Sequence, residues 1–396
     1  MSNIGANPDQ RMFLPKVALA GMIETLVGQE YTVIAPKLYR DVVKLRQITG
    51  SGEIARGVRD LQGGGHYRLE EGDEDLFFEY VVGPDSAKCY FFPARQELFS
   101  LDMENGRFAI HQSRTQVQKL ALFGLRPCDL AAIHVQDRVF AGREPAGAAR
   151  CEAELYYERV RAQSMLIAIN CTRPGGTCFC NSMETGPKAT EGYDVAMTEL
   201  RSGFVVEAGS DAGMSLLHEL PLRDPSPAEL ELADLKMERA REHMGRVLDT
   251  SDIVNLLDSN IEHARWDNVA ARCLSCGNCT MVCPTCFCST VSDSSDLAVK
   301  RAVRTRRWES CFAHEFSYTT IGPHRHTIRG RYRHWMRHKL GTWWEQFGTS
   351  GCVGCGRCIT WCPAGIDLTE ETAAIRGGVP RNDKDTAFPL KSEVAK

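Results

Sequence analysis

The stretch Cys273-Leu-Ser-Cys276-Gly-Asn-Cys279-Thr-Met-Val-Cys283-Pro284 decides what fold to expect. The same pattern returns near the end of the chain as Cys352-Val-Gly-Cys355-Gly-Arg-Cys358-Ile-Thr-Trp-Cys362-Pro363. Each copy reads C-x2-C-x2-C-x3-C-P, the run with which bacterial-type ferredoxins hold [4Fe–4S] clusters. Because both copies are complete and both close on Cys-Pro, we expect a chain that binds two iron–sulfur clusters and moves electrons.

The fourth cysteine of each run is expected to serve the cluster of the other run. Three cysteines at x2 spacing can wrap a cluster from one loop, whereas the cysteine before proline ligates the other cluster in two-cluster ferredoxins. We therefore predict cluster A on Cys273, Cys276, Cys279 and Cys362, and cluster B on Cys352, Cys355, Cys358 and Cys283. Gly277, Gly354 and Gly356 suit backbone that packs closely against sulfide or adopts positive φ. Zinc on C-x2-C pairs is the alternative, but zinc sites do not use the x3-C-P extension.

The interval between the runs is far longer than in a compact ferredoxin. Its segments Leu297–Trp308, Arg329–His338 and Leu340–Phe347 have helix-like patterns, which predicts a helical two-cluster domain with a long insert. The insert is strongly basic, with Glu309 and Glu315 set against Lys300, Arg301, Arg304, Arg306, Arg307, Arg325, Arg329, Arg331, Arg333, Arg337 and Lys339. These cations either form a solvated face, offset the negative charge of a cluster, or dock an acidic partner.

Composition narrows the class of protein. The chain has 396 residues, 43% of them hydrophobic and 25% charged, which is typical of a globular protein with more than one domain. A net charge of −4 argues against a general nucleic-acid binder. The apolar stretch 13–27 contains Lys16 and Glu24, so we expect neither a signal peptide nor a membrane span. An odd count of 17 cysteines without an export signal favours a cytoplasmic redox protein over a disulfide scaffold.

The N-terminal part of the chain has the pattern of an α/β layer. A strand at 119–123, helices at 130–140 and 152–163, and a strand at 165–169 follow one another, and residues 193–207 are typical of a hairpin. The run Gly63-Gly64-Gly65 lacks the flanking pattern of a phosphate loop and predicts a turn. We predict an α+β protein with an α/β domain at 1–222, a helical linker at 223–250 and a helical dicluster ferredoxin domain at 251–396.

Four further cysteines follow predicted strands in loops rich in Gly and Pro, where α/β folds place ligands: Cys128, Cys171, Cys178 and Cys180. They predict a third [4Fe–4S] cluster, and thiols without a cofactor are the open alternative. Cys286, Cys288 and Cys311 lie close to the cluster runs and are interpreted as packing residues or spares. Cys89 and Cys151 carry no signal, and no pattern singles out a catalytic residue.

Three segments carry a resemblance to a known family: Gly124-Leu-Arg-Pro-Cys-Asp-Leu-Ala-Ala132, residues 170–183 and residues 351–367. They resemble the beta subunit of cytosolic NiFe hydrogenases of the sulfhydrogenase type, and equally the electron-transfer subunit of anaerobic sulfite reductase. The resemblance implies a non-catalytic electron-transfer subunit. Its expected partners are a flavoprotein that binds FAD and handles NAD(P)H and a catalytic chain of the hydrogenase or sulfite reductase type. A free-standing carrier, and an enzyme whose N-terminal domain binds its own flavin, are the alternatives.

Overall fold

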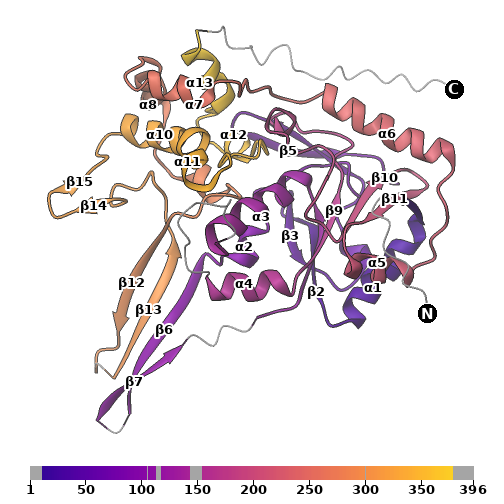
Figure 1. Ribbon diagram of the computed structural model, residues 1–396, viewed down its shortest axis with the longest axis horizontal. Coiled ribbons are helices and arrows are strands. Elements are labelled where there is room, and N and C mark those ends of the chain that lie inside the picture. The colour runs from indigo at the N-terminus through magenta and orange to yellow at the C-terminus, as the bar shows by residue number, and fades with distance from the viewer. Residues whose placement is uncertain (1–10, 105, 113–116, 143–153, 299, 378–396) are drawn as a thin grey trace.

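The computed structural model describes residues 11–104, 106–112, 117–142, 154–298 and 300–377 (Figure 1). A seven-stranded mixed sheet forms the centre of its N-terminal part. The strands are β1 (Met12–Pro15), β2 (Thr32–Tyr39), β3 (Val42–Gln47), β8 (Leu120–Leu125), β9 (Met165–Ile169), β10 (Val195–Glu199) and β11 (Gly203–Ala208). Their order is β1-β11-β10-β9-β8-β2-β3, in which β10, β9, β8 and β2 run parallel to their neighbours in that group. The predicted α+β class is confirmed.

Helices cover both faces of the sheet because successive strand residues point to opposite sides. Val33, Phe123 and Ile167 pack in one apolar layer with α1 (Leu19–Gly28) and α5 (Asp211–His218). The neighbouring strand residues, such as Leu122 and Leu166, pack in the other layer. That layer contains α2 (Lys88–Phe91), α3 (Pro127–Phe140) and α4 (Leu155–Ala162). The strand-helix-strand order predicted from the sequence is therefore present.

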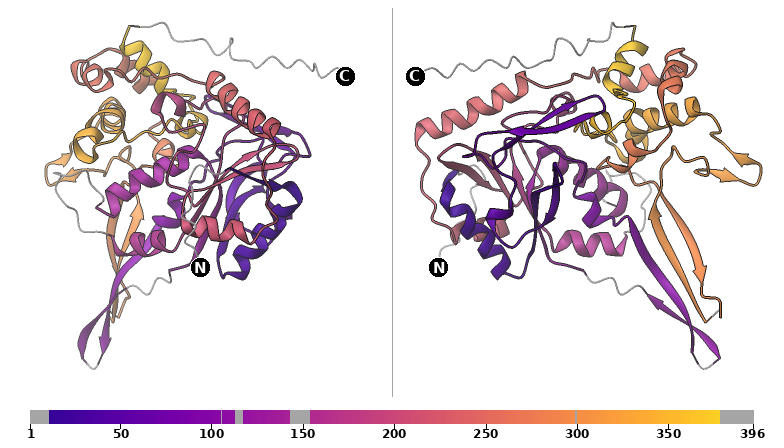
Figure 2. Two further views of the ribbon diagram at one scale, coloured as in Figure 1. Left: turned by 45° about the vertical axis from the view of Figure 1, so that its right-hand side comes forward. Right: turned by 180° about the vertical axis from the view of Figure 1, so that it is seen from behind.

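A second sheet projects from the body as a narrow arm (Figures 1 and 2). Its order is β12-β13-β6-β7, built from β6 (Arg95–Glu104), β7 (Arg107–Gln112), β12 (Ser289–Ser295) and β13 (Arg301–Trp308). The helix predicted over Leu297–Trp308 is wrong. Antiparallel pairing of β13 with the distant β6 supplies the backbone hydrogen bonds that decide for a strand, and local sequence does not report that pairing.

The C-terminal part is mostly helical and packs around its own apolar cluster, which includes Trp266, Tyr332 and Trp335. Its helices are α7 (Ile253–Ser259), α8 (Arg265–Arg272), α9 (Asn278–Met281), α10 (Ile328–Arg337), the π-helical η4 (His338–Thr342), α11 (Trp343–Phe347), α12 (Arg357–Thr360) and α13 (Leu368–Ile375). The preceding helix α6 (Pro227–Glu242) packs instead on β11 of the N-terminal sheet. The helices predicted at 329–338 and 340–347 are confirmed by α10, η4 and α11. Among the described residues no helix is long and apolar enough to cross a membrane.

Two small hairpins complete the fold. Strands β14 (Tyr318–Thr319) and β15 (Gly322–Pro323) form one within the insert. The other consists of β4 (Val58–Gly63) and β5 (His66–Glu71), so the triple glycine is a turn as predicted. That turn lies on the second cysteine run, because the Gly65 N–H donates to the Ile359 carbonyl at 3.0 Å. The predicted domain boundaries stay a prediction, and this contact and the arm both join the two halves of the chain.

Candidate iron–sulfur sites

The four cysteines predicted for cluster A line one pocket. Cys273, Cys276 and Cys279 come from the loop before α9 and its first turn, and Cys362 follows α12. Gly277, at φ +75°, begins α9, and a Cβ there would lie 2.7 Å from Ser310 Oγ. Cys276 is exposed, so this pocket reaches the protein surface.

The other walls of this pocket offer buried hydrogen-bond donors. Tyr332 and Trp335 line it from α10, with side chains 3% and 5% exposed. Among the described residues neither the Tyr332 hydroxyl nor the Trp335 indole N–H has a hydrogen-bond partner. Buried donors without partners are costly, and cluster sulfur atoms accept hydrogen bonds. The donor set of the pocket therefore fits a [4Fe–4S] group.

The cysteines predicted for cluster B also converge. The pKa of Cys358 is raised first by burial and then by the neighbouring thiols of Cys352, Cys355 and Cys283. Cys283 belongs to the first run and lies among the cysteines of the second. Cys279 also acts on Cys358, and Cys358 lines the cluster A pocket as well, so the division into two ligand sets stays a prediction. Cys283, Cys352 and Cys355 are each less than 10% exposed, and this set lies deeper than the cluster A pocket.

A buried lysine is bonded to the crossed cysteine. Lys339 is 4% exposed, and its ammonium donates to Cys283 Sγ at 3.1 Å, Thr285 Oγ1 at 3.0 Å and the Gly351 carbonyl at 2.9 Å. Burial works to lower the pKa of Lys339, but the thiols of Cys283, Cys286 and Cys352 raise it well above its ordinary value. The lysine is therefore a cation whose charge favours thiolate at Cys283. Of the three roles expected for the basic residues of the insert, the position of Lys339 favours the one in which a cation offsets the negative charge of a cluster.

The N-terminal cysteines lie at the ends of parallel strands. Cys128 is in the first turn of α3 after β8, and Cys171 follows β9. All four of the set are between 6% and 8% exposed. The thiols of Cys171 and Cys180 each raise the pKa of Cys178 after the larger effect of burial, and Cys180 does the same to Cys128. The tertiary structure thus gathers cysteines that are scattered in the sequence.

This N-terminal set packs directly against the second ferredoxin run. The Phe179 N–H donates to the Gly354 carbonyl at 2.8 Å. Gly354, at φ +64°, has so little room that an added Cβ would lie 2.7 Å from Cys180 N. Gly356, at φ +74°, would place a Cβ 2.4 Å from the Thr177 carbonyl. These glycines are needed for close backbone approach, and they hold the loop 177–180 beside Cys355.

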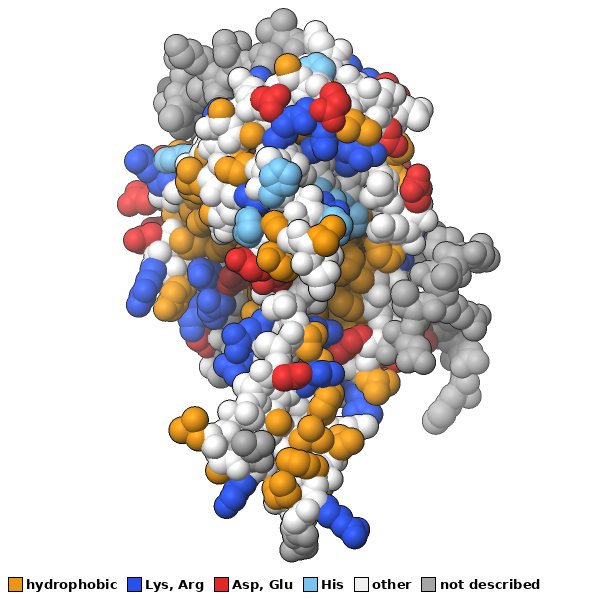
Figure 3. All heavy atoms as spheres, turned by 90° about the vertical axis from the view of Figure 1, so that its left-hand side faces the viewer, with side chains coloured by type: hydrophobic (Ala, Val, Ile, Leu, Met, Phe, Trp, Pro, Cys, Tyr) orange, Lys and Arg blue, Asp and Glu red, His pale blue; other side chains and the backbone are white. Residues whose placement is uncertain are grey.

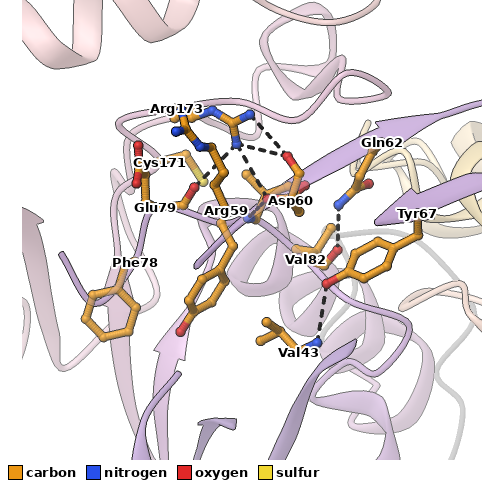
Figure 4. Close-up of polar contacts among 12 residues, drawn as sticks. Val43, Arg59, Asp60, Gln62, Tyr67, Phe78, Glu79, Val82, Cys171 and Arg173 are labelled. Carbon is orange, nitrogen blue, oxygen red and sulfur yellow. Dashed lines mark hydrogen bonds and ion pairs between the residues drawn. The ribbon is translucent and has the colours of Figure 1, made fainter. Parts of the chain in front are cut away.

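Arginine side chains surround the N-terminal set. Arg126 is buried, and its Nη1 approaches Cys171 Sγ at 4.0 Å while its Nη2 donates to the carbonyls of Phe78 and Tyr80. Figure 4 shows Arg173 close to Cys171 and Asp60, with its guanidinium donating to the Asp60 carbonyl at 3.1 Å. Burial raises the pKa of Cys171, whereas Arg126 lowers it. Positive charge beside these thiols suits an anionic thiolate–iron group.

Arg357 joins the N-terminal set to the cluster B set. It is 1% exposed, and its Nη2 donates to Asp129 Oδ1 at 2.8 Å. Burial works to lower its pKa, but Asp129, Cys355 and Cys128 raise it. Among the described residues its Nη1 has no hydrogen-bond partner. A buried guanidinium with a spare donor between two cysteine sets fits sulfur acceptors on either side.

The basic insert is largely neutralised within the chain. Arg329 pairs with Glu262 at 2.7 Å and Asp267 at 3.1 Å, and Arg333 also pairs with Glu262. Figure 3 shows Lys and Arg side chains beside Asp and Glu on this face of the molecule. Arg331 is buried and donates to Ser275 Oγ at 3.2 Å, next to Cys276. Part of the insert therefore orders the first cysteine run.

The remaining cysteines near the runs were interpreted as packing residues or spares, and Cys311 and Cys288 do pack in the apolar cluster of the C-terminal part. Cys286, Cys288 and Cys311 lie together near Lys339 and Cys283. Cys89 is exposed, and Cys151 lies outside the described residues. Within the part of the chain that the structure describes, no three His, Cys, Asp or Glu side chains gather tightly enough to be recognised as a site for a single metal ion.

Comparison with known proteins adds two findings. Residues 272–366 match the model of a 4Fe-4S dicluster domain. The chain is 30% identical over 335 residues to sulfhydrogenase 2 subunit beta of Pyrococcus furiosus, covering 83% of this chain and 94% of that protein. No solved structure matches the chain.

Proposed function

Because the chain belongs to the family of sulfhydrogenase beta subunits, we propose that it relays electrons within a multisubunit complex of the NiFe hydrogenase type. Its dicluster domain carries two [4Fe–4S] clusters, so the chain is an iron–sulfur electron-transfer subunit. The proposed partners are a flavoprotein that binds FAD and handles NAD(P)H, and a chain with the hydrogenase active site. We place this complex in the cytoplasm.

The crossed grouping of the ferredoxin cysteines carries the proposal. We assign cluster A to Cys273, Cys276, Cys279 and Cys362, which line one pocket. We assign cluster B to Cys352, Cys355, Cys358 and Cys283, whose thiols are neighbours. Bound clusters would accept and release single electrons. The chain contributes the buried thiols, the donors from Tyr332 and Trp335, and the ammonium of Lys339.

We further propose a third [4Fe–4S] cluster on Cys128, Cys171, Cys178 and Cys180. Its support is their shared burial, their mutual electrostatic influence and the arginines beside them. The close packing of Gly354 on the loop of Cys180 would place this group next to cluster B. The buried guanidinium of Arg357, which interacts with Asp129 and with the thiols of Cys355 and Cys128, adds a fixed positive charge beside this set.

The three cysteine sets differ in solvent exposure, which indicates where a partner subunit can approach the chain. The N-terminal set and most of the cluster B set are buried, whereas Cys276 is exposed and its neighbour Leu274 is 66% exposed. We propose that one partner subunit meets the chain at this loop. Because electron transfer weakens steeply with distance, a partner's redox group needs such an exposed edge to approach.

Anaerobic purification from the native host tests the relay. Recovery with a flavoprotein and a NiFe subunit supports it. Recovery with a sulfite reductase subunit would show that the catalytic partner is not a hydrogenase. Recovery of the chain alone would refute the complex. Flavin retained by the isolated chain would favour the alternative in which this chain is itself an enzyme. Iron and sulfide analysis of the isolated chain tests the clusters, since three [4Fe–4S] groups give about twelve irons and two give about eight.

A matched set of variants tests the ligands. Cys276→Ser is expected to remove or alter cluster A alone, and Cys355→Ser cluster B alone, in the reduced-state EPR spectrum. Cys89→Ser is the control, because Cys89 is exposed and belongs to neither set. An unchanged spectrum in either ligand variant would remove the corresponding assignment.

A further inference from the structure

Cysteines outside all three ligand sets meet at the base of the arm. Cys288 directly precedes β12, and Cys311 lies three residues beyond β13. Antiparallel pairing of Ser289 with Trp308 brings the two segments side by side, and the Glu309 N–H donates to the Cys288 carbonyl at 2.9 Å. Sheet register therefore fixes the backbone that carries this pair.

The two thiols are near enough to influence each other. Cys311 lowers the pKa of Cys288 through its side chain and its backbone N–H, and Cys288 raises the pKa of Cys311. Cys288 is partly exposed, while Cys311 is 4% exposed. A reagent in solvent can therefore reach the thiol of Cys288, whereas the thiol of Cys311 is buried beneath it.

Two buried lysines lie in this region; the pKa of Lys339 is raised by the neighbouring thiols, whereas burial lowers that of Lys88. Lys339 bonds to Cys283, and Lys88, 3% exposed, donates to the carbonyls of Met281 at 3.2 Å and Cys286 at 3.3 Å. The hydrogen bonds from Cys311 lower the pKa of Cys288 to about 7, against the effect of burial, and Lys339 and Lys88 contribute. The pKa of Cys311 is raised, so the pair consists of a thiolate and a thiol that donates to it.

We propose that Cys288 and Cys311 are a thiol–disulfide redox pair that exchanges with low-molecular-weight disulfides. The Cys288 thiolate attacks the disulfide RSSR, forms the mixed disulfide Cys288–S–S–R and releases RS⁻. Cys311 then loses its proton and attacks Cys288 Sγ, which closes the Cys288–Cys311 bond and releases a second RS⁻. The two cysteines lose two electrons and RSSR gains them as two thiols. A partly exposed thiolate of low pKa with a resolving cysteine behind it is the arrangement that such exchange requires.

The pair also lies within the electrostatic reach of the cluster B set. The pKa of Cys283 is lowered first by Cys286 and that of Cys288 first by Cys311, and the ammonium of Lys339 lowers both further. Oxidation removes the negative charge of the Cys288 thiolate, so the electrostatic potential at Cys283 becomes more positive. This consequence rests on the proposed function, whereas the thiol exchange itself does not.

The test uses the full-length chain under anaerobic conditions with glutathione disulfide at graded ratios to glutathione. After acid quenching and alkylation with N-ethylmaleimide, peptide mapping is expected to show a Cys288–Cys311 disulfide that disappears as reduced glutathione rises. Cys288→Ser and Cys311→Ser should each abolish the linked peptide, and Cys89→Ser should retain it. Alkylation of both cysteines at every ratio would overturn the proposal.

Iron analysis of the same samples separates this inference from the relay. The two serine variants are expected to keep the iron content of the unmodified chain. Loss of about four irons in either variant would make these cysteines cluster ligands and overturn the redox pair. A low iron content in the unmodified chain, with the linked peptide still formed, would instead count against the proposed clusters and leave the thiol pair supported.

Discussion

Replacement of Lys339 by methionine should make the midpoint potential of cluster B more negative. The lysine ammonium lies 3.1 Å from Cys283 Sγ and is 4% exposed, so solvent screens it weakly. Reduction adds negative charge to the cluster and its thiolates, and a fixed cation nearby stabilises the reduced form. Methionine has a similar length but no charge, so the reduced form loses that stabilisation.

The size of the shift follows from Coulomb's law. A full charge at 3.1 Å interacts with about 5 kcal/mol at an effective dielectric constant of about 20. If about a quarter of the added electron resides on this sulfur, the loss is about 1.3 kcal/mol, or about 60 mV for a one-electron couple. The whole charge at this distance would give an upper limit of about 200 mV. We expect a negative shift between these limits.

EPR-monitored redox titration of the isolated chain measures the shift. Lys339→Gln keeps a hydrogen-bond donor without the charge and should shift the potential in the same direction, which separates charge from hydrogen bonding. Lys300→Met on the exposed arm removes the same charge from the surface and serves as the control. Iron content and circular dichroism confirm that the variants are folded. Potentials of Lys339→Met and Lys339→Gln equal to that of Lys300→Met would refute the reasoning.

The remaining predictions concern packing and hydrogen bonding. Tyr332→Phe removes a buried hydroxyl from the cluster A pocket and should lower the potential of cluster A alone; an equal shift of both clusters would contradict the site assignment. Gly354→Ala places a Cβ 2.7 Å from Cys180 N at a residue with positive φ. It should lower the free energy of unfolding, measured in urea, by about 1–3 kcal/mol or more. The control Gly52→Ala has open space around the added Cβ and should lower it by less than about 1 kcal/mol. Asp129→Asn leaves the buried Arg357 without its carboxylate and should cost about 3–5 kcal/mol in the free energy of unfolding, whereas Asp293→Asn, in the exposed pair with Arg304, should leave stability nearly unchanged. A fragment of residues 251–396 lacks β6, the partner of β13, so circular dichroism should show an unfolded or aggregated product; a cooperative thermal transition would contradict this expectation.

Sequence alone determined the parts of this protein that depend on local spacing. The two cysteine runs identify the dicluster domain because cluster ligation imposes a fixed pattern of thiolates and glycines on a short loop. The central strands and the helices α3 and α10 follow from hydrophobic patterns, and α6 follows from its good helix formers; one element expresses either signal within its own residues. The pairing of Cys283 with the second run was predicted because the motif itself encodes the crossing.

Only the tertiary structure decided which distant side chains meet. The sequence of β13 has a helix-like pattern, and its pairing with β6 decides for a strand. Cys288 and Cys311 are far apart in the sequence, and the pairing of β12 with β13 brings their backbones side by side. Lys339 and Arg357 are ordinary basic residues in the sequence, and burial against thiols turns them into fixed charges beside the cysteine sets. Local periodicity reports what one segment prefers. Contacts between residues far apart in the sequence also depend on how the intervening chain folds. The residues of one segment therefore do not predict them.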